Sequence, residues 1–312
     1  MKKIADSVLD LIGSTPMLKL QQFSRRRGLK HPIWAKVESF NPGGSAKDRV
    51  ALQMIEEAEK QGLLKPGATI VEPTSGNTGV GLALVGSLKS YQVILTMPDN
   101  MSLERRQLLK AYGARVELVP AAQGMSGAIA LAEQLCREIP GSIMLKQFEN
   151  QANPQAHYLG TGPEIWQQSD GLVDVFVAGV GTGGTLCGTA RYLKQQNPEI
   201  KVVAVEPLLS PMLSRGTFKP HGLQGMGPDF VPATFDASLC DGYIGVSDEE
   251  AMQTARDLAK EEGLLVGISA GAALAAALKL AQEKDFENKH IVVLLPDTGE
   301  RYLSTALFSS SD

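Results

Sequence analysis

Short apolar runs rich in β-branched residues alternate along this chain with segments whose apolar residues recur at helical spacing. The runs that we interpret as strands lie at residues 33–38, 70–71, 93–97, 116–119, 173–177, 202–205 and 291–295. Such an alternation is typical of parallel-rich sheets flanked by helices on both faces. Ligands of these sheets bind in the loops that follow the carboxyl ends of strands. The sequence therefore predicts an α/β protein with its functional residues in those loops.

The loop at residues 72–79 follows one predicted strand and precedes a helical pattern over residues 80–88. Its uncharged polar side chains are those of Thr74, Ser75, Asn77 and Thr78. A helix N-terminus presents backbone N–H groups that have no partner within the helix, and these side chains add further donors. One such residue is enough to cap a helix, so four together indicate a site for a carboxylate or a phosphate.

A second loop, Gly179-Val180-Gly181-Thr182-Gly183-Gly184-Thr185, also lies between a predicted strand and a helical pattern. Glycine permits positive φ and close backbone approach, so this loop can surround a phosphate with N–H groups while its threonines donate hydroxyls. The same glycines fit a dinucleotide fingerprint, and Glu206 lies where a ribose-binding acid belongs. A nicotinamide-dependent dehydrogenase is therefore a distant alternative, although it leaves the loop at residues 72–79 unexplained.

Lys47 falls in the first turn of a helical pattern that follows a turn with Pro42, and Ser45 is the expected N-cap. The helix macrodipole is positive at this end and lowers the affinity of the amine for its proton. Because a neutral amine is needed to form a Schiff base, the position suits a lysine that binds pyridoxal phosphate. The alternative is a solvated first turn in which Asp48 compensates Lys47 and Arg49.

Four motifs carry a resemblance to a known family. They are Pro42-Gly43-Gly44-Ser45-Ala46-Lys47-Asp48-Arg49, Thr74-Ser75-Gly76-Asn77-Thr78-Gly79, Gly181-Thr182-Gly183-Gly184-Thr185 and Gly267-Ile268-Ser269-Ala270-Gly271. In this order they resemble the cysteine synthase (O-acetylserine sulfhydrylase) family of fold-type II pyridoxal-phosphate enzymes. The similarity extends from Ile12 to Thr305, which is nearly the whole chain.

The resemblance implies a role for each motif. Lys47 would hold pyridoxal 5'-phosphate as a Schiff base and then act as the catalytic base on the α-proton. The implied cofactor-binding residues are Lys47, Asn77, Gly181, Thr182, Gly183, Gly184, Thr185 and Ser269. The implied substrate-binding residues are Thr74, Ser75, Asn77, Thr78 and Gln147.

Ser269 would face the pyridine nitrogen of the cofactor. A hydroxyl there leaves the nitrogen largely neutral, whereas a carboxylate would keep it protonated, so the serine favours β-elimination over racemisation. Ser269 would also serve as a cap for the helical pattern at residues 272–280. Asp297-Thr298 stands where many members carry two serines near the ring, which is a departure from the family pattern.

The implied reaction is a β-replacement by a transferase that converts O-acetyl-L-serine and sulfide to L-cysteine and acetate. A cystathionine β-synthase-like enzyme or a thiosulfate-using enzyme that forms S-sulfocysteine is the nearer alternative. Residues 221–232 contain no arginine, and a dianion such as thiosulfate calls for such a partner. We therefore predict sulfide as the donor. The family also implies a homodimer and a possible complex with serine acetyltransferase.

The composition agrees with a two-lobed metabolic enzyme, because 312 residues of which 43% are apolar can form two sizeable cores. We expect a smaller mobile lobe at residues 38–150, with Lys47 and the loop at residues 72–79, which we call the carboxylate loop. Residues 1–37 and 151–312 would form the larger lobe, with the cofactor between the two. A net charge of −4 provides no basic surface for nucleic acid. No run spans a membrane and no signal peptide begins the chain, so we expect a cytoplasmic protein.

Three cysteines and four histidines are scattered without the spacing of a disulfide framework or a metal site. We expect each cysteine to be a small apolar residue. His157 lies near the site in related enzymes, but we favour a structural role for it. No metal is predicted.

Overall fold

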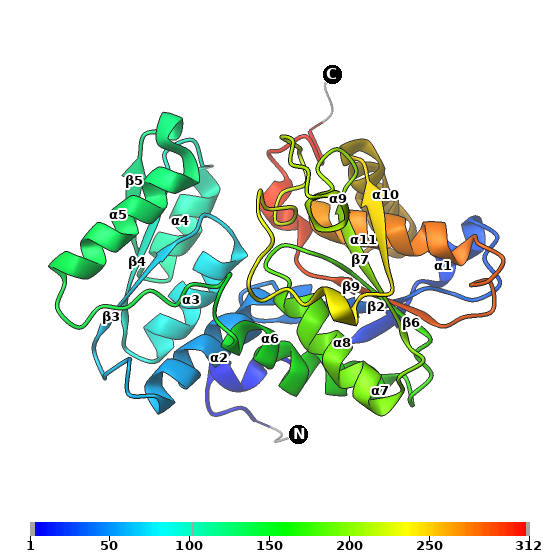
Figure 1. Cartoon of the computed structure of the whole chain (residues 1–312), viewed down its shortest axis with the longest axis horizontal. Coiled ribbons are helices and arrows are strands. Elements are labelled where there is room, and N and C mark those ends of the chain that lie inside the picture. Colours follow the sequence, from blue (N-terminus) through cyan, green and yellow to red (C-terminus); the bar gives the residue numbers. More distant parts are fainter. Residues whose placement is uncertain (1–3, 102, 310–312) are drawn as a thin grey trace. The chain divides into compact units, whose positions relative to one another are not determined.

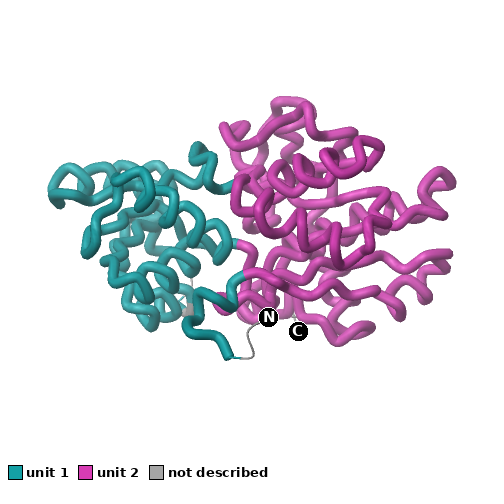
Figure 2. The backbone as a smooth tube through the Cα atoms, turned by 90° about the horizontal axis from the view of Figure 1, so that it is seen from below, with its two compact units in different colours: residues 1–12, 47–153 teal, residues 13–46, 154–312 magenta. Residues whose placement is uncertain are grey.

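The computed structural model describes residues 4–101 and 103–309. The chain forms two compact units, coloured teal and magenta in Figure 2. Unit 1 contains the residues up to Ile12 and Lys47–Asn153, and unit 2 contains Gly13–Ala46 and the residues from Pro154 onward. These boundaries differ from those expected at residues 38 and 150. The mobility of the smaller lobe stays a prediction.

Unit 1 is built on a parallel sheet of three strands in the order β3-β4-β5. Its strands are β3 (Thr69–Pro73), β4 (Gln92–Pro98) and β5 (Arg115–Val119). Its helices are η1 (Val8–Leu11), α2 (Lys47–Lys60), α3 (Asn77–Leu88), α4 (Leu103–Ala111), η3 (Ala121–Gln123) and α5 (Gly124–Glu138). Ile70 and Leu95 face the core with α2 and α3, whereas Val71 and Ile94 face α5. Helices therefore cover both faces of the sheet (Figure 1).

Unit 2 is built on a sheet of six strands in the order β1-β2-β9-β6-β7-β8. Its strands are β1 (Met17–Lys19), β2 (Trp34–Val37), β6 (Val175–Gly179), β7 (Lys201–Pro207), β8 (Gly242–Val246) and β9 (Ile291–Leu295). Its helices are α1 (Gln21–Arg26), η2 (Glu38–Phe40), η4 (His157–Thr161), α7 (Gly162–Gln168), α8 (Gly184–Gln196), α9 (Met212–Arg215), η5 (Ala237–Leu239), α10 (Asp248–Glu262), α11 (Ile268–Ala281) and η6 (Gly299–Tyr302). Helix α6 (Ala152–Ala156) carries the chain from unit 1 into unit 2.

The predicted α/β class is confirmed, and so is each predicted strand region. Two strands were not predicted. β1 has only three residues, two of them exposed, and it pairs antiparallel with β2. β8 begins with glycine and has a second glycine at position 245, which weakens its strand signal. The larger sheet is therefore mixed, because β1 is antiparallel to its neighbour while the other neighbouring pairs are parallel.

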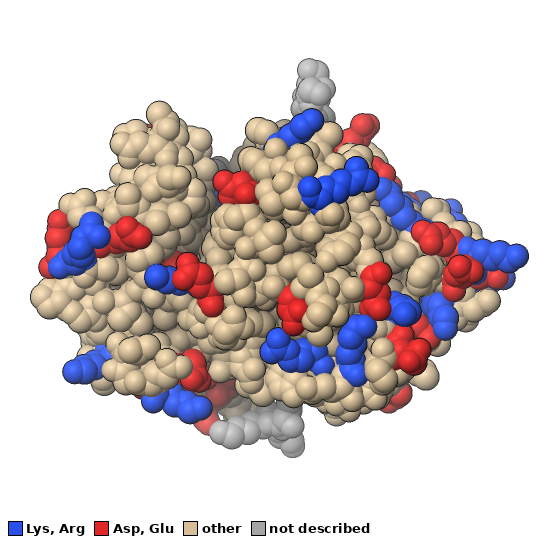
Figure 3. All heavy atoms as spheres, viewed as in Figure 1, with Lys and Arg blue, Asp and Glu red and all other residues tan. Residues whose placement is uncertain are grey.

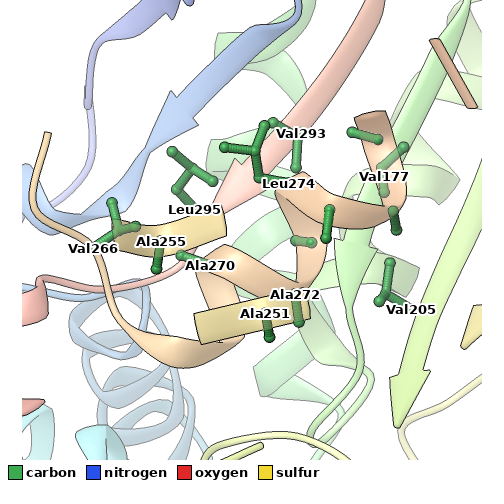
Figure 4. Packing of buried hydrophobic residues seen from close by; sticks show 14 of the residues in the cluster. Val177, Val205, Ala251, Ala255, Val266, Ala270, Ala272, Leu274, Val293 and Leu295 are labelled. Carbon is green, nitrogen blue, oxygen red and sulfur yellow. The ribbon is translucent and has the colours of Figure 1, made fainter. Parts of the chain in front are cut away.

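Alternate residues of the unit 2 strands face opposite layers of helices. Val177 and Val293 point toward α11 (Figure 4), whereas Phe176 and Val292 pack with α8. α11 is rich in alanine and almost wholly buried. A side chain on Gly271 would place its Cβ 2.1 Å from the carbonyl oxygen of Ala251. The backbones of α10 and α11 therefore pack in direct contact.

The face shown in Figure 3 carries acidic and basic side chains interspersed with one another. Interspersed charges of both signs do not create the single-sign field that attracts nucleic acid. Among the helices of the described residues, none combines the length and the apolarity needed to cross a membrane.

Leu274 offers a test of the core of unit 2. Its side chain is fully buried between the helices and the sheet (Figure 4), so Leu274→Ala should lower the free energy of unfolding by about 2–5 kcal/mol. Leu172→Ala is the control, because Leu172 is 53% exposed and its truncation should change stability by less than about 0.5 kcal/mol. Urea titration measures both variants. Equal effects of the two substitutions would contradict the packing described.

Candidate active site

The carboxylate loop of unit 1 connects β3 to α3. Gly76 is the N-cap of α3. Because glycine has no side chain, the N-cap residue makes no side-chain hydrogen bond to the first N–H groups of the helix. Thr74 and Thr78 are buried in this loop, whereas Ser75 and Asn77 are partly exposed. The loop therefore presents hydroxyls, an amide and helix N–H groups at the positive end of a twelve-residue helix.

Gln147 belongs to the same group of residues. The Thr78 hydroxyl donates to Gln147 Oε1 over 2.6 Å, which leaves the Gln147 amide N–H groups as donors for a ligand. The predicted substrate residues Thr78 and Gln147 are thus brought together by the fold of unit 1. This arrangement suits a carboxylate, which accepts hydrogen bonds at both of its oxygens.

Glu72 positions the segment that carries Gln147. Its buried carboxylate accepts from the backbone N–H of Leu145 at 2.9 Å, of Lys146 at 3.1 Å and of Gln147 at 3.2 Å. Burial raises the pKa of Glu72, and the three N–H groups oppose that shift. Lys146 has a left-handed φ of 55°, a conformation that costs a non-glycine residue about 1 kcal/mol or more. The Glu72 carboxylate therefore stabilises the turn at residues 145–147. This role of Glu72 was not predicted from the sequence.

Lys47 is the first residue of α2 and is half-buried. A side chain on Gly81 would place its Cβ 2.7 Å from the carbonyl oxygen of Lys47, so α3 packs directly on the first turn of α2. The backbone of Lys47 is thereby held against Gly81, which lies one helical turn after Asn77, the first residue of α3. Ser45, the expected N-cap, does not directly precede the helix; it forms a β-bridge with Asp297.

The glycine-rich loop of unit 2 connects β6 to α8, as expected. Gly183 adopts a left-handed φ of +87°, and a Cβ there would lie 2.9 Å from the Cβ of Phe235. At Gly181 a Cβ would lie 2.5 Å from the carbonyl oxygen of Gly225. The Gly184 N–H donates to Thr182 Oγ1, and the Thr234 hydroxyl donates to the Thr182 carbonyl. The loop is a preformed backbone cradle at the N-terminus of a thirteen-residue helix.

Ser269 lies in the first turn of α11, whose N-cap is Gly267. Its hydroxyl oxygen is 3.8 Å from where a Cβ on Gly225 would lie, so one segment of unit 2 adjoins both Ser269 and Gly181. Asp297 is fully buried and accepts from the Tyr302 hydroxyl over 2.7 Å. One carboxylate oxygen of Asp297 packs against the Cα of Gly267.

Other candidate groups have structural partners. Glu206, the ribose-binding acid of the dehydrogenase alternative, accepts from the N–H of Leu213 and from the hydroxyl and N–H of Ser214. It therefore caps α9. Burial raises the pKa of Cys187 to about 11 and that of Cys240 to about 12. Within the described residues, no three His, Cys, Asp or Glu side chains form a group suited to a metal.

The N-termini of α3 and α8 suit anionic groups such as a carboxylate and a phosphate. A family model for pyridoxal-phosphate dependent enzymes matches residues 8–297. The chain therefore belongs to the family of pyridoxal-phosphate dependent enzymes.

Particular members of this family are similar over nearly their whole length. Cysteine synthase A of Escherichia coli K12 is 51% identical, with 99% of this chain and 97% of that protein covered. A solved cysteine synthase of Entamoeba histolytica superposes with a TM-score of 0.96 and 41% identity, with 100% of this chain and 93% of that chain covered. O-ureido-L-serine synthase superposes with a TM-score of 0.94 and 44% identity, with 99% and 96% covered.

The cradle at Gly183 predicts a specific sensitivity. Gly183→Ala combines left-handed strain with a clash against Phe235, so we expect it to raise the dissociation constant of pyridoxal phosphate at least about tenfold. Gly216→Ala is the matched control, because Gly216 has a φ of +64° and nothing within 4 Å of the added Cβ. Fluorescence titration of the cofactor-free chain measures both constants. A similar change in the two variants would show that the cradle does not hold the cofactor.

Proposed function

We propose that this chain is a cysteine synthase that converts O-acetyl-L-serine and sulfide to L-cysteine and acetate. Its similarity to cysteine synthases over nearly the whole chain supports this activity. The observation that carries it within the molecule is the N-terminus of α3. There the Thr78–Gln147 pair is arranged for a carboxylate, and Gly81 of the same helix packs on Lys47.

The residues present fit pyridoxal phosphate. At Gly181 and Gly183 the loop packs directly on Gly225 and Phe235, which fixes its backbone. The N-terminus of α8, which has no side-chain N-cap, then presents N–H groups that suit a phosphate. Lys47, Asn77 and Ser269 would hold the rest of the cofactor. When bound, pyridoxal phosphate supplies an electron-withdrawing ring that makes the α-proton of an attached amino acid acidic.

Lys47 is the proposed catalytic base. Its position at the first residue of α2 favours the neutral amine, because the helix macrodipole disfavours a cation there. The Lys47 Nζ would take the α-proton of the substrate, which allows acetate to leave from the β-carbon with the electrons of the Cβ–O bond. Hydrosulfide then forms the Cβ–S bond, and Nζ returns the proton to the α-carbon.

The carboxylate loop would orient the substrate for this proton transfer. Thr74, Ser75, Asn77 and Thr78 are proposed to bind the substrate carboxylate together with the Gln147 amide. Glu72 would act as a positioning residue, because it holds the backbone of Gln147. A fixed carboxylate restricts the α-carbon to one orientation, and such positioning accounts for a large part of many enzymatic rates.

The proposed donor is sulfide. The segment adjoining Ser269 is Gly225-Met226-Gly227, and residues 221–232 carry neither lysine nor arginine. A segment without cationic side chains admits a small monoanion but provides no partner for a dianion. The thiosulfate-using alternative is therefore not favoured, and the similarity to cysteine synthases also disfavours a cystathionine β-synthase-like enzyme.

Assembly and location complete the proposal on the strength of the family alone. We propose a homodimer in the cytoplasm, and a complex with serine acetyltransferase as a further interaction. Sedimentation of the purified chain, alone and with that enzyme, tests both assemblies.

Lys47→Ala should abolish turnover. Removing a general base typically costs 10²–10⁴-fold in rate, and the lysine is also the proposed attachment point, so we expect kcat/KM to fall at least about 10³-fold. Lys60→Ala, at the exposed end of the same helix, is the control and should keep full activity. Cysteine formation from O-acetyl-L-serine measures both variants, and circular dichroism checks the fold. Activity of Lys47→Ala within tenfold of the unmodified enzyme would exclude it as the base.

Donor preference is tested by comparing kcat/KM for sulfide, thiosulfate and homocysteine at saturating O-acetyl-L-serine. We expect the largest value for sulfide. Gln224 is exposed and precedes Gly225, which adjoins Ser269; Gln224→Arg introduces a cation there and should raise the value for thiosulfate relative to sulfide, with Gln224→Met as the control. A larger constant for thiosulfate or homocysteine in the unmodified enzyme would overturn the assignment of the donor.

A further inference from the structure

His157 connects two threonine hydroxyls in the interior of unit 2. Its ring is fully buried, with Nδ1 2.9 Å from Thr161 Oγ1 and Nε2 3.1 Å from Thr185 Oγ1. Thr185 is the last residue of the glycine-rich loop, and its side chain is only half-buried. The contacts thus form a chain of polar groups that begins in the interior and ends at the proposed phosphate site.

The local backbone is built to hold this contact. His157 begins the π-helical segment η4, and π-helical turns are rare and frequent at functional sites. A Cβ on Gly188 would lie 2.0 Å from the carbonyl oxygen of Pro154 and 2.9 Å from the Cβ of His157. Glycine at position 188 therefore lets α8 approach the segment closely enough for the imidazole to reach Thr185.

Hydrogen-bond direction decides what the imidazole does. A neutral imidazole has one N–H donor and one acceptor nitrogen. If Nε2 accepted from the Thr185 hydroxyl, the single hydrogen of that hydroxyl would point away from the loop. If Nε2 carries the proton and donates to Thr185 Oγ1, the hydroxyl hydrogen is left for another acceptor. A phosphate offers only acceptors at its ionised oxygens, so it selects the second arrangement.

We propose that His157 is a positioning residue that directs the Thr185 hydroxyl toward the cofactor phosphate. The Thr161 hydroxyl donates to Nδ1, Nε2–H donates to Thr185 Oγ1, and Thr185 donates to the phosphate. This inference rests on the proposed function, because it takes the loop from Gly181 to Thr185 as the phosphate site. It replaces the purely structural role that the sequence favoured for His157.

Two substitutions of His157 distinguish the role of Nε2 from that of Nδ1. The amide of His157→Gln reaches the place of Nε2 and can still donate to Thr185, whereas the amide of His157→Asn reaches only the place of Nδ1. We expect His157→Asn to raise the dissociation constant of pyridoxal phosphate roughly ten- to hundredfold, as for one hydrogen bond to a charged group. His157→Gln should raise it by less than about threefold.

A double-mutant cycle tests whether His157 acts through Thr185. Thr185→Val removes the hydroxyl at nearly constant volume, and Thr185→Ser is its control. In the Thr185→Val background, His157→Asn should change the dissociation constant by less than about twofold, because the hydroxyl it orients is gone. An equal factor in both backgrounds, or no effect of His157→Asn on the unmodified loop, would overturn the proposal.

The ring tautomer provides a readout that needs no substitution. With pyridoxal phosphate bound to the full-length chain, ¹⁵N spectroscopy should show His157 protonated at Nε2 and unprotonated at Nδ1. A proton on Nδ1 would overturn the proposal even if the His157 variants fail to fold. The proposed function has its own test. If the unmodified chain binds pyridoxal phosphate and forms cysteine, the proposed function holds whatever the His157 variants do. If it does neither, the proposed function is wrong, independently of the result for His157.

Discussion

Direct backbone contact at three glycines is the constraint on which the candidate site depends. Gly81 of α3 packs on the carbonyl of Lys47, Gly188 of α8 on that of Pro154 and Gly271 of α11 on that of Ala251. Each glycine lies about one turn after the start of its helix, and each helix carries proposed ligand-binding residues in or beside its first turn. A single methyl group at any of the three positions would push that helix start away from its neighbour.

The same construction explains why the proposed binding groups are largely backbone groups. Helix N-termini supply N–H donors whose positions are set by packing rather than by flexible side chains. Side chains then refine the donors: Glu72 fixes the backbone at residues 145–147, and Thr182 binds the Gly184 N–H. A site of this kind is preorganised, so little conformational entropy remains to be lost when a ligand binds.

The sequence predicted much of this because its signals are local. Apolar periodicity located seven of the strands. The helices that begin at Lys47, Asn77 and Gly184 follow loops that were predicted from their content of glycine and small polar residues. The missed elements depend on partners distant in sequence. β1 is a strand only because β2 pairs with it. The sequence shows Glu72 only as a residue of a strand, because its hydrogen-bond partners, residues 145–147, lie some seventy positions later. The contact between His157 and Thr185 likewise joins segments that no local pattern relates.

The three thiols give the molecule a property that suits an enzyme whose proposed product is itself a thiol. Burial raises the pKa of each, to about 11 for Cys187 and about 12 for Cys240. At pH 7, a group with a pKa of about 11 is a thiolate in roughly one molecule in ten thousand, and the thiolate is the species that attacks disulfides and persulfides. The chain can therefore work among reactive sulfur compounds while Cys187 and Cys240 stay almost entirely in the thiol form.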